Sequence, residues 1–329
     1  MLGQTTPSYK NDPEFQKAFR EAQSLRGQQL GFVPDAYKKA NKIAGGRCME
    51  CLQGMYNAQM QIGQPKDAAG TAALMVAIAE APIDKSRAQY MRAQALLSQA
   101  GEKPKPAQLD AVEGALKESL TAYPRNASAL FLEGKVLAMM GKNDEAKVAF
   151  HQCLECAPPG DPSRLRAEHF EENPQLSLAK MAPAFTVNTL SGEKFQLDAM
   201  GGRVVLIDFW ATWCGPCNEE LPEMKKIAKE FAGRPLVIIS VSWDSDEAKW
   251  KEFIQKKEMT WMQYRDSDHK LSDAFGIHAI PHYFTIDSDG VLTAEMVGEG
   301  SDVEGKLRKL VAKAEAARAK LQATKVAGQ

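Results

Sequence analysis

The sequence has no surplus of charge of one sign. Its 329 residues include 41 Lys and Arg against 42 Asp and Glu, which leaves a formal net charge of −1. A protein that holds nucleic acid by its phosphates needs an excess of cationic side chains on one face, so nucleic acid is not an expected partner. With 44% hydrophobic and 25% charged residues, the chain has the composition of a folded globular protein and not of a disordered one.

Long apolar runs are also missing. The longest, residues 71–79, is about half of the roughly 20 residues that a membrane-spanning helix requires, so the protein is not expected to be transmembrane. The N-terminus has no basic stretch followed by an apolar one, which a secretory signal would have. Its polar start is expected either for a cytoplasmic protein or for a mature form from which a signal has been removed.

No cysteine stands without a neighbour at the same spacing. The six cysteines form three C-x-x-C pairs: Cys48 with Cys51, Cys153 with Cys156, and Cys214 with Cys217. None of the pairs is followed by His, which excludes attachment of a c-type haem. A zinc ion held by four cysteines would require two pairs to meet in space. The domain organisation argues against that, and no metal site is expected.

The first half of the chain predicts helices only. Residues 12–157 are rich in Ala, Leu, Met, Gln and Lys and poor in β-branched residues. Breaks that contain Pro or Gly recur at intervals of roughly 34 to 42 residues, which indicates stacked helical hairpins. In the clearest hairpin, residues 126–158, the small residues Gly134 and Ala146 allow two helices to approach closely, and Pro158 ends the second helix.

This hairpin resembles the tetratricopeptide repeat, and residues 33–124 resemble it more loosely. The resemblance implies an all-α domain of helical-hairpin repeats over residues 1–158, which would hold a partner or a substrate protein. A generic helical bundle is the alternative. A proline-containing, charged linker is expected over residues 159–179.

The chain changes character after residue 180, where β-branched and aromatic runs alternate with helical patterns. Strands are expected at residues 203–209, 236–242, 283–286 and 291–296, and helices at residues 222–231, 247–257 and 303–321. The last two strands flank Asp-Ser-Asp-Gly at residues 287–290, which predicts a hairpin turn between them. Alternating strands and helices predict an α/β domain over residues 180–329, with a largely parallel sheet covered by helices.

The third cysteine pair lies where chemistry is expected. Cys214-Gly215-Pro216-Cys217 follows an apolar strand and precedes a helix, so Cys214 should cap the helix N-terminus. Free backbone N–H groups and the helix dipole favour an anion there, which lowers the pKa of the thiol and makes Cys214 the nucleophile. Cys217, one turn further on, would resolve the mixed disulfide.

The residues around this pair carry a specific resemblance. The run from Phe209 to Cys217, Phe-Trp-Ala-Thr-Trp-Cys-Gly-Pro-Cys, resembles the active site of the thioredoxin superfamily. The segments Ala-Pro-Ala-Phe at residues 182–185, Gly-Arg-Val-Val-Leu at 202–206 and Glu-Leu-Pro at 220–222 are similar to the TlpA/ResA branch of thiol–disulfide oxidoreductases. Peroxiredoxins share the Ala-Pro-x-Phe segment but use a different cysteine motif.

The resemblance covers about residues 180 to 300 and implies a thioredoxin fold with protein-disulfide oxidoreductase activity. The redox-active cysteine pair would work without a cofactor, on protein substrates that carry disulfides or thiols and with an unidentified electron-donor or acceptor protein. The Gly-Pro dipeptide between the cysteines favours a reductase, although the surroundings of a pair shift its potential.

Two acids could serve the resolving cysteine. Asp208 stands where thioredoxin keeps a buried acid, and Glu220 matches an acid of the TlpA/ResA branch. A carboxylate in apolar surroundings has a raised pKa, so either could accept the proton of Cys217. The alternatives are a satisfied buried acid for Asp208 and a solvated helix charge for Glu220.

The family pattern also implies residues that meet the substrate. Pro281 would be a cis-proline facing the cysteines, and the backbone of Ile280 would pair with an extended substrate segment. Trp213, with Gly215 and Pro216, would border the site as a contact surface. His282 is expected to point away from the cysteines, and Trp210 to belong to the core.

The remaining pairs are interpreted as structural. Residues three apart share a helical face, so local disulfides Cys48–Cys51 and Cys153–Cys156 are the first expectation, and free buried thiols are the alternative. Paired cysteines, the family resemblance and the polar N-terminus together favour a periplasmic or otherwise extracytoplasmic location, with cytoplasmic as the alternative.

Two hypotheses about function remain open at this point. The first is a thiol–disulfide oxidoreductase that acts through Cys214 and Cys217. The second is a non-catalytic binding module of tetratricopeptide type, whose thioredoxin-like domain only senses redox state.

Overall fold

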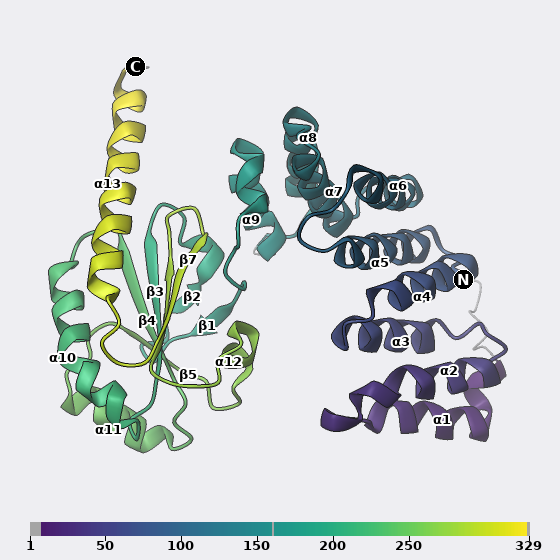
Figure 1. Cartoon of the computed structure of the whole chain (residues 1–329), viewed down its shortest axis with the longest axis horizontal. Helices are drawn as coiled ribbons and strands as arrows, with labels where there is room; N and C mark the ends of the chain where they lie inside the picture. Colours follow the sequence, from purple (N-terminus) through teal and green to yellow (C-terminus); the bar gives the residue numbers. More distant parts are fainter. Residues whose placement is uncertain (1–7, 160, 328–329) are drawn as a thin grey trace. The chain divides into compact units, whose positions relative to one another are not determined.

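A computed structural model describes residues 8–159 and 161–327. The chain divides into two compact units, Met1–Gln175 and Leu176–Gln329 (Figure 1). The first unit is helical and the second is an α/β unit, so the predicted fold class is confirmed.

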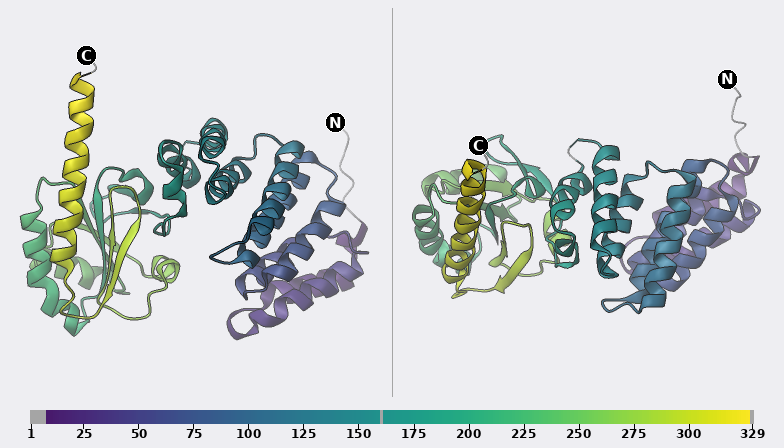
Figure 2. Two further views of the ribbon diagram at one scale, coloured as in Figure 1. Left: turned by 45° about the horizontal axis from the view of Figure 1, so that its top comes forward. Right: turned by 90° about the horizontal axis from the view of Figure 1, so that it is seen from above.

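The first unit is a succession of helices, each packed against the next along the chain (Figure 2). Short 3-10 helices, η1 (Ser8–Asn11) and η2 (Gly27–Phe32), flank the first α-helix. Six of the helices have Pro in their first turn, where its missing N–H costs nothing. The α-helices are α1 (Pro13–Ser24), α2 (Val33–Ile43), α3 (Met49–Gln61), α4 (Pro65–Ile78), α5 (Pro82–Ala100), α6 (Pro106–Ala122), α7 (Ala127–Met139), α8 (Asn143–Cys156) and α9 (Pro162–Glu172).

The linker predicted over residues 159–179 is wrong for residues 162–172, which form α9. Phe170 is buried and packs its ring against Phe131 and Phe150, with ring centroids 5.8 and 5.4 Å apart. Ala167 is buried on the same helix. The charged outer face of α9 masked this short apolar stripe in the sequence.

The second unit contains a five-stranded sheet of order β5-β4-β3-β6-β7 and a separate two-stranded hairpin, β1–β2. The neighbours β3, β4 and β5 are parallel, whereas β6 and β7 are antiparallel to their partners. The sheet predicted to be largely parallel is therefore parallel across β3, β4 and β5 only. The hairpin predicted from the turn at residues 287–290 is confirmed, because that turn joins the antiparallel strands β6 and β7. The strands are β1 (Thr186–Asn188), β2 (Lys194–Gln196), β3 (Val204–Trp210), β4 (Leu236–Ser242), β5 (Met262–Arg265), β6 (His282–Ile286) and β7 (Leu292–Val297).

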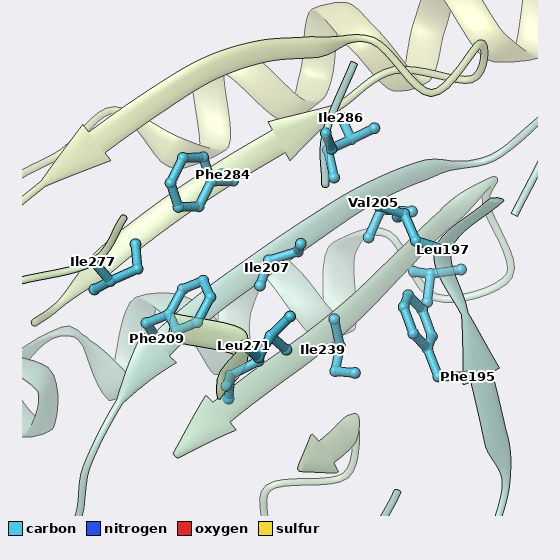
Figure 3. Packing of buried hydrophobic residues seen from close by; sticks show 13 residues of the cluster. Phe195, Leu197, Val205, Ile207, Phe209, Ile239, Leu271, Ile277, Phe284 and Ile286 are labelled. Atoms are coloured by element: carbon cyan, nitrogen blue, oxygen red, sulfur yellow. The ribbon is translucent and has the colours of Figure 1, made fainter. Parts of the chain in front are cut away.

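Both faces of the sheet are covered, which buries all seven residues of β3. On one face, the β1–β2 hairpin and a short helix, α12 (Lys270–Phe275), close a core around Phe209 and Phe284 (Figure 3). On the other face lie α10 (Gly215–Glu230) and α13 (Val303–Ala327), as Figure 1 shows. The remaining elements are η3 (Pro174–Leu178), η4 (Leu197–Ala199) and α11 (Glu247–Lys256), and α11 packs beside α10.

Candidate active site

The redox site is built where β3 ends and α10 begins. Cys214 is the N-cap of α10, with an extended backbone (φ −81°, ψ 109°). Its Sγ accepts a hydrogen bond from the backbone N–H of Cys217 at 3.2 Å. The two sulfurs are bonded to each other at 1.98 Å, and the Cα atoms are 5.3 Å apart. The helix N-terminus expected from the sequence therefore meets the sulfur of Cys214.

Apolar side chains enclose the two sulfurs almost completely. Cys214 is 5% exposed and Cys217 is 8% exposed. They share a cluster with Trp210, Leu221, Trp250 and neighbours, and Ile280 packs against its margin. Such surroundings keep most water away from the disulfide.

The rim of the site is open to solvent. The Trp213 side chain is 65% exposed, and Gly215 and Pro216 are exposed as well. On the opposite side the Ile280–Pro281 peptide bond is cis, as the resemblance implies, and Pro281 leads directly into β6. The structure thus brings Ile280 to the cysteines and presents Trp213 outward beside them.

Asp208 lies on β3, the strand that leads into this site. Its side chain is buried at 4% exposure, and Ser240 on β4 donates a hydrogen bond to its Oδ2 at 2.7 Å. Burial raises the pKa of Asp208 to about 7; the hydrogen bond from Ser240 opposes the rise and the negative charge of Glu220 adds to it. Burial, with the charges of Asp208 and Glu220, also raises the pKa of Tyr283, which pairs with Asp208 from β6.

Glu220 lies nearly one turn beyond Cys217 on α10 and is partly exposed. Its Oε1 accepts the backbone N–H of Gly300 at 2.6 Å, which ties the loop after β7 to α10. The two acids selected from the sequence therefore lie near enough to influence each other, but they differ in burial and in partners.

Comparison with known proteins agrees with this geometry. Residues 178–295 match the AhpC/TSA family. The chain is 29% identical over 143 residues to the thiol-disulfide oxidoreductase ResA of Bacillus thuringiensis (strain Al Hakam), covering 43% of this chain and 83% of the relative. It is 35% identical over 122 residues to the thioredoxin-like protein YneN of Bacillus subtilis (strain 168), covering 36% of this chain and 71% of the relative.

The chain belongs to the thioredoxin-like thiol–disulfide oxidoreductases. Among solved structures, it is similar to the thioredoxin domain of a thiol-disulfide oxidoreductase from Bacteroides vulgatus, at 29% identity and a TM-score of 0.37, over 40% of this chain and 96% of that one. The family match lies within the second unit.

The loop before Cys214 in this oxidoreductase depends on a residue that the sequence analysis missed. Asp244, 4% exposed, follows β4 and accepts the backbone N–H of Thr212 at 2.9 Å and the Thr212 hydroxyl at 2.5 Å. Asn218 on α10 donates to the carbonyl of Thr212 at 3.1 Å. The sequence carried one signal for this residue: Asp244 is an acid two residues after the buried strand β4. The carboxyl ends of parallel strands meet at one edge of the sheet, so a side chain there can reach the loop after β3.

His282 points away from the redox site, as expected. Its Nε2 lies 3.1 Å from Glu295 on β7, and its ring stacks on Phe284 with centroids 4.9 Å apart. Since His282 pairs with Phe209 and Tyr283 pairs with Asp208, the two neighbours face opposite sides of the sheet.

The other two cysteine pairs differ from each other. Cys48 is the N-cap of α3 and is bonded to Cys51 at 2.12 Å, with both residues fully buried. Cys153 and Cys156 are free thiols, so the disulfide first expected there is wrong and the alternative holds for the buried Cys153. Burial raises the pKa of Cys153 to about 11, which keeps this thiol protonated.

The difference between these pairs has a backbone cause. Inside a helix, Cβ atoms three residues apart are about 5–6 Å apart, whereas a disulfide requires about 3.5–4.5 Å. Cys153 and Cys156 both lie within α8, whereas the extended N-cap residues Cys48 and Cys214 direct their sulfurs toward the first turn.

No group of three or more His, Cys, Asp or Glu side chains within residues 8–159 and 161–327 is arranged to hold a metal ion. In the same part of the chain, none of the helices combines the length and the apolar character needed to cross a bilayer.

Proposed function

We propose that Cys214 and Cys217 form a dithiol–disulfide couple that reduces disulfides of protein substrates. The observation that carries the proposal is the position of Cys214 at the N-cap of α10, where its sulfur accepts a backbone N–H and is bonded to Cys217. Hydrogen-bond donors and the helix dipole at that position stabilise a thiolate.

The reaction proceeds in two exchanges. The thiolate of Cys214 attacks one sulfur of a substrate disulfide, which breaks that S–S bond and gives a mixed disulfide and a substrate thiolate. The thiol of Cys217 then loses its proton to a carboxylate and attacks the sulfur of Cys214, which breaks the mixed disulfide and releases the second substrate thiolate. The product is the oxidised Cys214–Cys217 pair, and a partner dithiol returns it to the reduced form without any bound cofactor.

We assign Asp208 as the main proton acceptor of the second exchange. Its pKa of about 7 allows it to take up and release a proton near neutral pH. Glu220 is partly exposed and bonded to the Gly300 amide, which supports an auxiliary role through its charge. Pro281 and Ile280 would bound the substrate on one side, and Trp213, Gly215 and Pro216 on the other.

The helical unit would hold a partner or substrate as a repeat domain of tetratricopeptide type. A hollow of about 590 Å³ lies in the second unit, and one of about 540 Å³ lies in the helical unit, lined by Tyr56, Arg87, Tyr90, Tyr123 and Arg125 among others. Aromatic rings and guanidinium groups are enriched where proteins bind each other. This supports the hollow in the helical unit as the surface that binds a partner or substrate. The disulfide buried in the same unit supports an extracytoplasmic location, where disulfides persist.

Reduction of insulin by dithiothreitol, with the full chain as catalyst, tests the assignment of the cysteines. Cys214→Ser should lower the rate to that of dithiothreitol alone, and Cys217→Ser should accumulate a mixed disulfide at Cys214 that mass spectrometry detects. Cys153→Ala, which removes a buried free thiol of the helical unit outside the proposed binding surface, serves as the matched control and should retain the full rate. Catalysis by Cys214→Ser would refute the proposal and favour a non-catalytic binding protein.

A further inference from the structure

Asp208 stands at the end of a line of two short hydrogen bonds. Ser240 occupies the position beside Asp208 on the neighbouring strand and donates its hydroxyl to Oδ2 at 2.7 Å. Trp261, just before β5, donates its indole N–H to the Oγ of Ser240, also at 2.7 Å. Ser240 is fully buried and Asp208 nearly so, so water cannot easily replace either bond.

The direction of these bonds is fixed by chemistry. An indole N–H donates and has no acceptor, whereas a hydroxyl has one hydrogen and two lone pairs. The Oγ of Ser240 therefore accepts from Trp261, and its single hydrogen is directed at Asp208. Without Trp261, the hydroxyl would be free to rotate toward other acceptors.

We propose that Ser240, oriented by Trp261, is a positioning residue that keeps the carboxyl of Asp208 able to accept and release the proton of Cys217 at neutral pH. The inference rests on the proposed role of Asp208. A donor aimed at a carboxylate stabilises its charged form, whereas burial stabilises the neutral form. The hydrogen bond from Ser240 thus opposes the effect of burial. It keeps the Asp208 carboxyl from being permanently protonated, so that the group can both accept and release a proton.

The other groups that face Asp208 do not supply this effect. Glu220 on α10 carries a negative charge that favours the neutral form of Asp208, and Tyr283 on β6 is an acid whose ionisation is suppressed by burial. Within the described residues, the hydrogen bond from Ser240 is the interaction that lowers the pKa of Asp208. Removing it leaves burial and Glu220 unopposed.

The same geometry restricts the path of the proton. Because Trp261 cannot accept a proton, Ser240 cannot pass one outward through it. Ser240 and Trp261 therefore set the acidity of Asp208 without carrying its proton, which must be exchanged on the side of α10. Trp261 also packs against the apolar cluster that contains both active-site cysteines. The side chain that orients Ser240 therefore also contacts the surroundings of the disulfide.

Titration of the Asp208 carboxyl in the oxidised full chain tests the inference, because neither active-site thiol titrates in that form. The carboxyl ¹³C resonance of labelled aspartate is followed against pH, and Asp208→Asn identifies the signal. Ser240→Ala should raise the midpoint by about one pH unit, since a hydrogen bond to a charged group is lost. Trp261→Phe, which keeps an aromatic ring and removes the N–H, should raise it by a smaller amount.

Thr285→Val is the matched control. Thr285 is fully buried on β6 and exchanges hydrogen bonds with Thr293, not with Asp208, so the midpoint should not move. A midpoint in Ser240→Ala within about 0.3 unit of the parent, or below it, overturns the inference. If Ser240→Ala does not fold, Trp261→Phe decides the question. An Asp208 midpoint that is unchanged or lower in Trp261→Phe then overturns the inference.

The pH profile of insulin reduction separates this inference from the proposed function. If Asp208→Asn slows exchange while Ser240→Ala leaves the titration unmoved, only the role of Ser240 is lost. If Asp208→Asn leaves the rate and its pH profile unchanged, the assignment of Asp208 as proton acceptor fails, and the inference falls with it.

Discussion

Asp208 couples the acidity of the redox site to the stability of the second unit. Its pKa is raised from 3.8 to about 7 by burial, so the folded chain holds a proton that the unfolded chain releases between these values. The free energy of unfolding therefore falls as the pH rises through this window, by up to about 4 kcal/mol, and stays level above it.

Asp208→Asn removes this charge, so the variant should be more stable than the parent at pH 8. The difference should shrink toward pH 4. Denaturant unfolding across the pH range measures it. Glu219→Gln, at an exposed acid of α10, changes the net charge equally and should show no such dependence. Equal effects of the two substitutions would contradict the burial argument.

The sequence was informative about residues whose role is set by local spacing. Cys214 and Cys217 were predictable because a helix N-terminus after a buried strand determines their chemistry. Ser240 and Asp244 were not, because their partners lie about 30 residues away and meet them only through the parallel register of β3 and β4. The register of these two strands cannot be inferred from local sequence patterns.

At the scale of secondary-structure elements, α7 and α8 pack closely because one residue lacks a side chain. A Cβ atom added at Gly134 would lie 2.6 Å from the ring of Phe150, which is fully buried. The ring cannot move aside without disturbing Phe131 and Phe170, which it contacts. The sequence predicted that α7 and α8 approach closely at Gly134, and this is confirmed: the ring of Phe150 packs directly against the backbone of Gly134.

Gly134→Ala should destabilise the helical unit by about 1–3 kcal/mol through overpacking. Gly114→Ala on α6 is the matched control, because nothing lies within 4 Å of the added Cβ. It should stabilise the same unit by about 0.5–1 kcal/mol, since Ala favours the helical backbone over Gly. Far-ultraviolet circular dichroism during denaturation measures both changes. Destabilisation of similar size by both substitutions would show that helix propensity, and not the Phe150 contact, dominates.

The errors at the element scale have a common origin. The helix α9 was mistaken for a linker because its two buried apolar residues, among charged ones, give a weak periodic signal. The helix predicted over residues 222–231 is the second part of α10, which begins at Gly215 after the predicted cap Cys214 and continues through Pro222. In both cases packing against a neighbouring element outweighs local propensity.

At the scale of the whole molecule, the chain consists of two units that each bury their own apolar clusters. The sequence predicted both because the change from helical to mixed patterning is abrupt. The five tryptophans, at positions 210, 213, 243, 250 and 261, all belong to the second unit, so tryptophan fluorescence reports on that unit alone.

Gly134→Ala should therefore shift the loss of helical circular dichroism to lower denaturant and leave the fluorescence transition in place. At pH 8, Asp208→Asn should move the fluorescence transition to higher denaturant and leave the transition of the helical unit in place. Both optical signals, recorded on the same samples, make the comparison. Transitions that shift together for either variant would show that the units unfold as one.

The ionisation of Cys214 tests the central claim most directly, because every step of the proposed exchange begins with its thiolate. The rate of iodoacetamide alkylation is measured against pH in reduced Cys217→Ser, with labelling of Cys214 quantified by mass spectrometry. The N-cap position on α10 predicts that Cys214 reacts as a thiolate at a lower pH than free cysteine. A thiol that ionises no more readily than free cysteine would contradict the account.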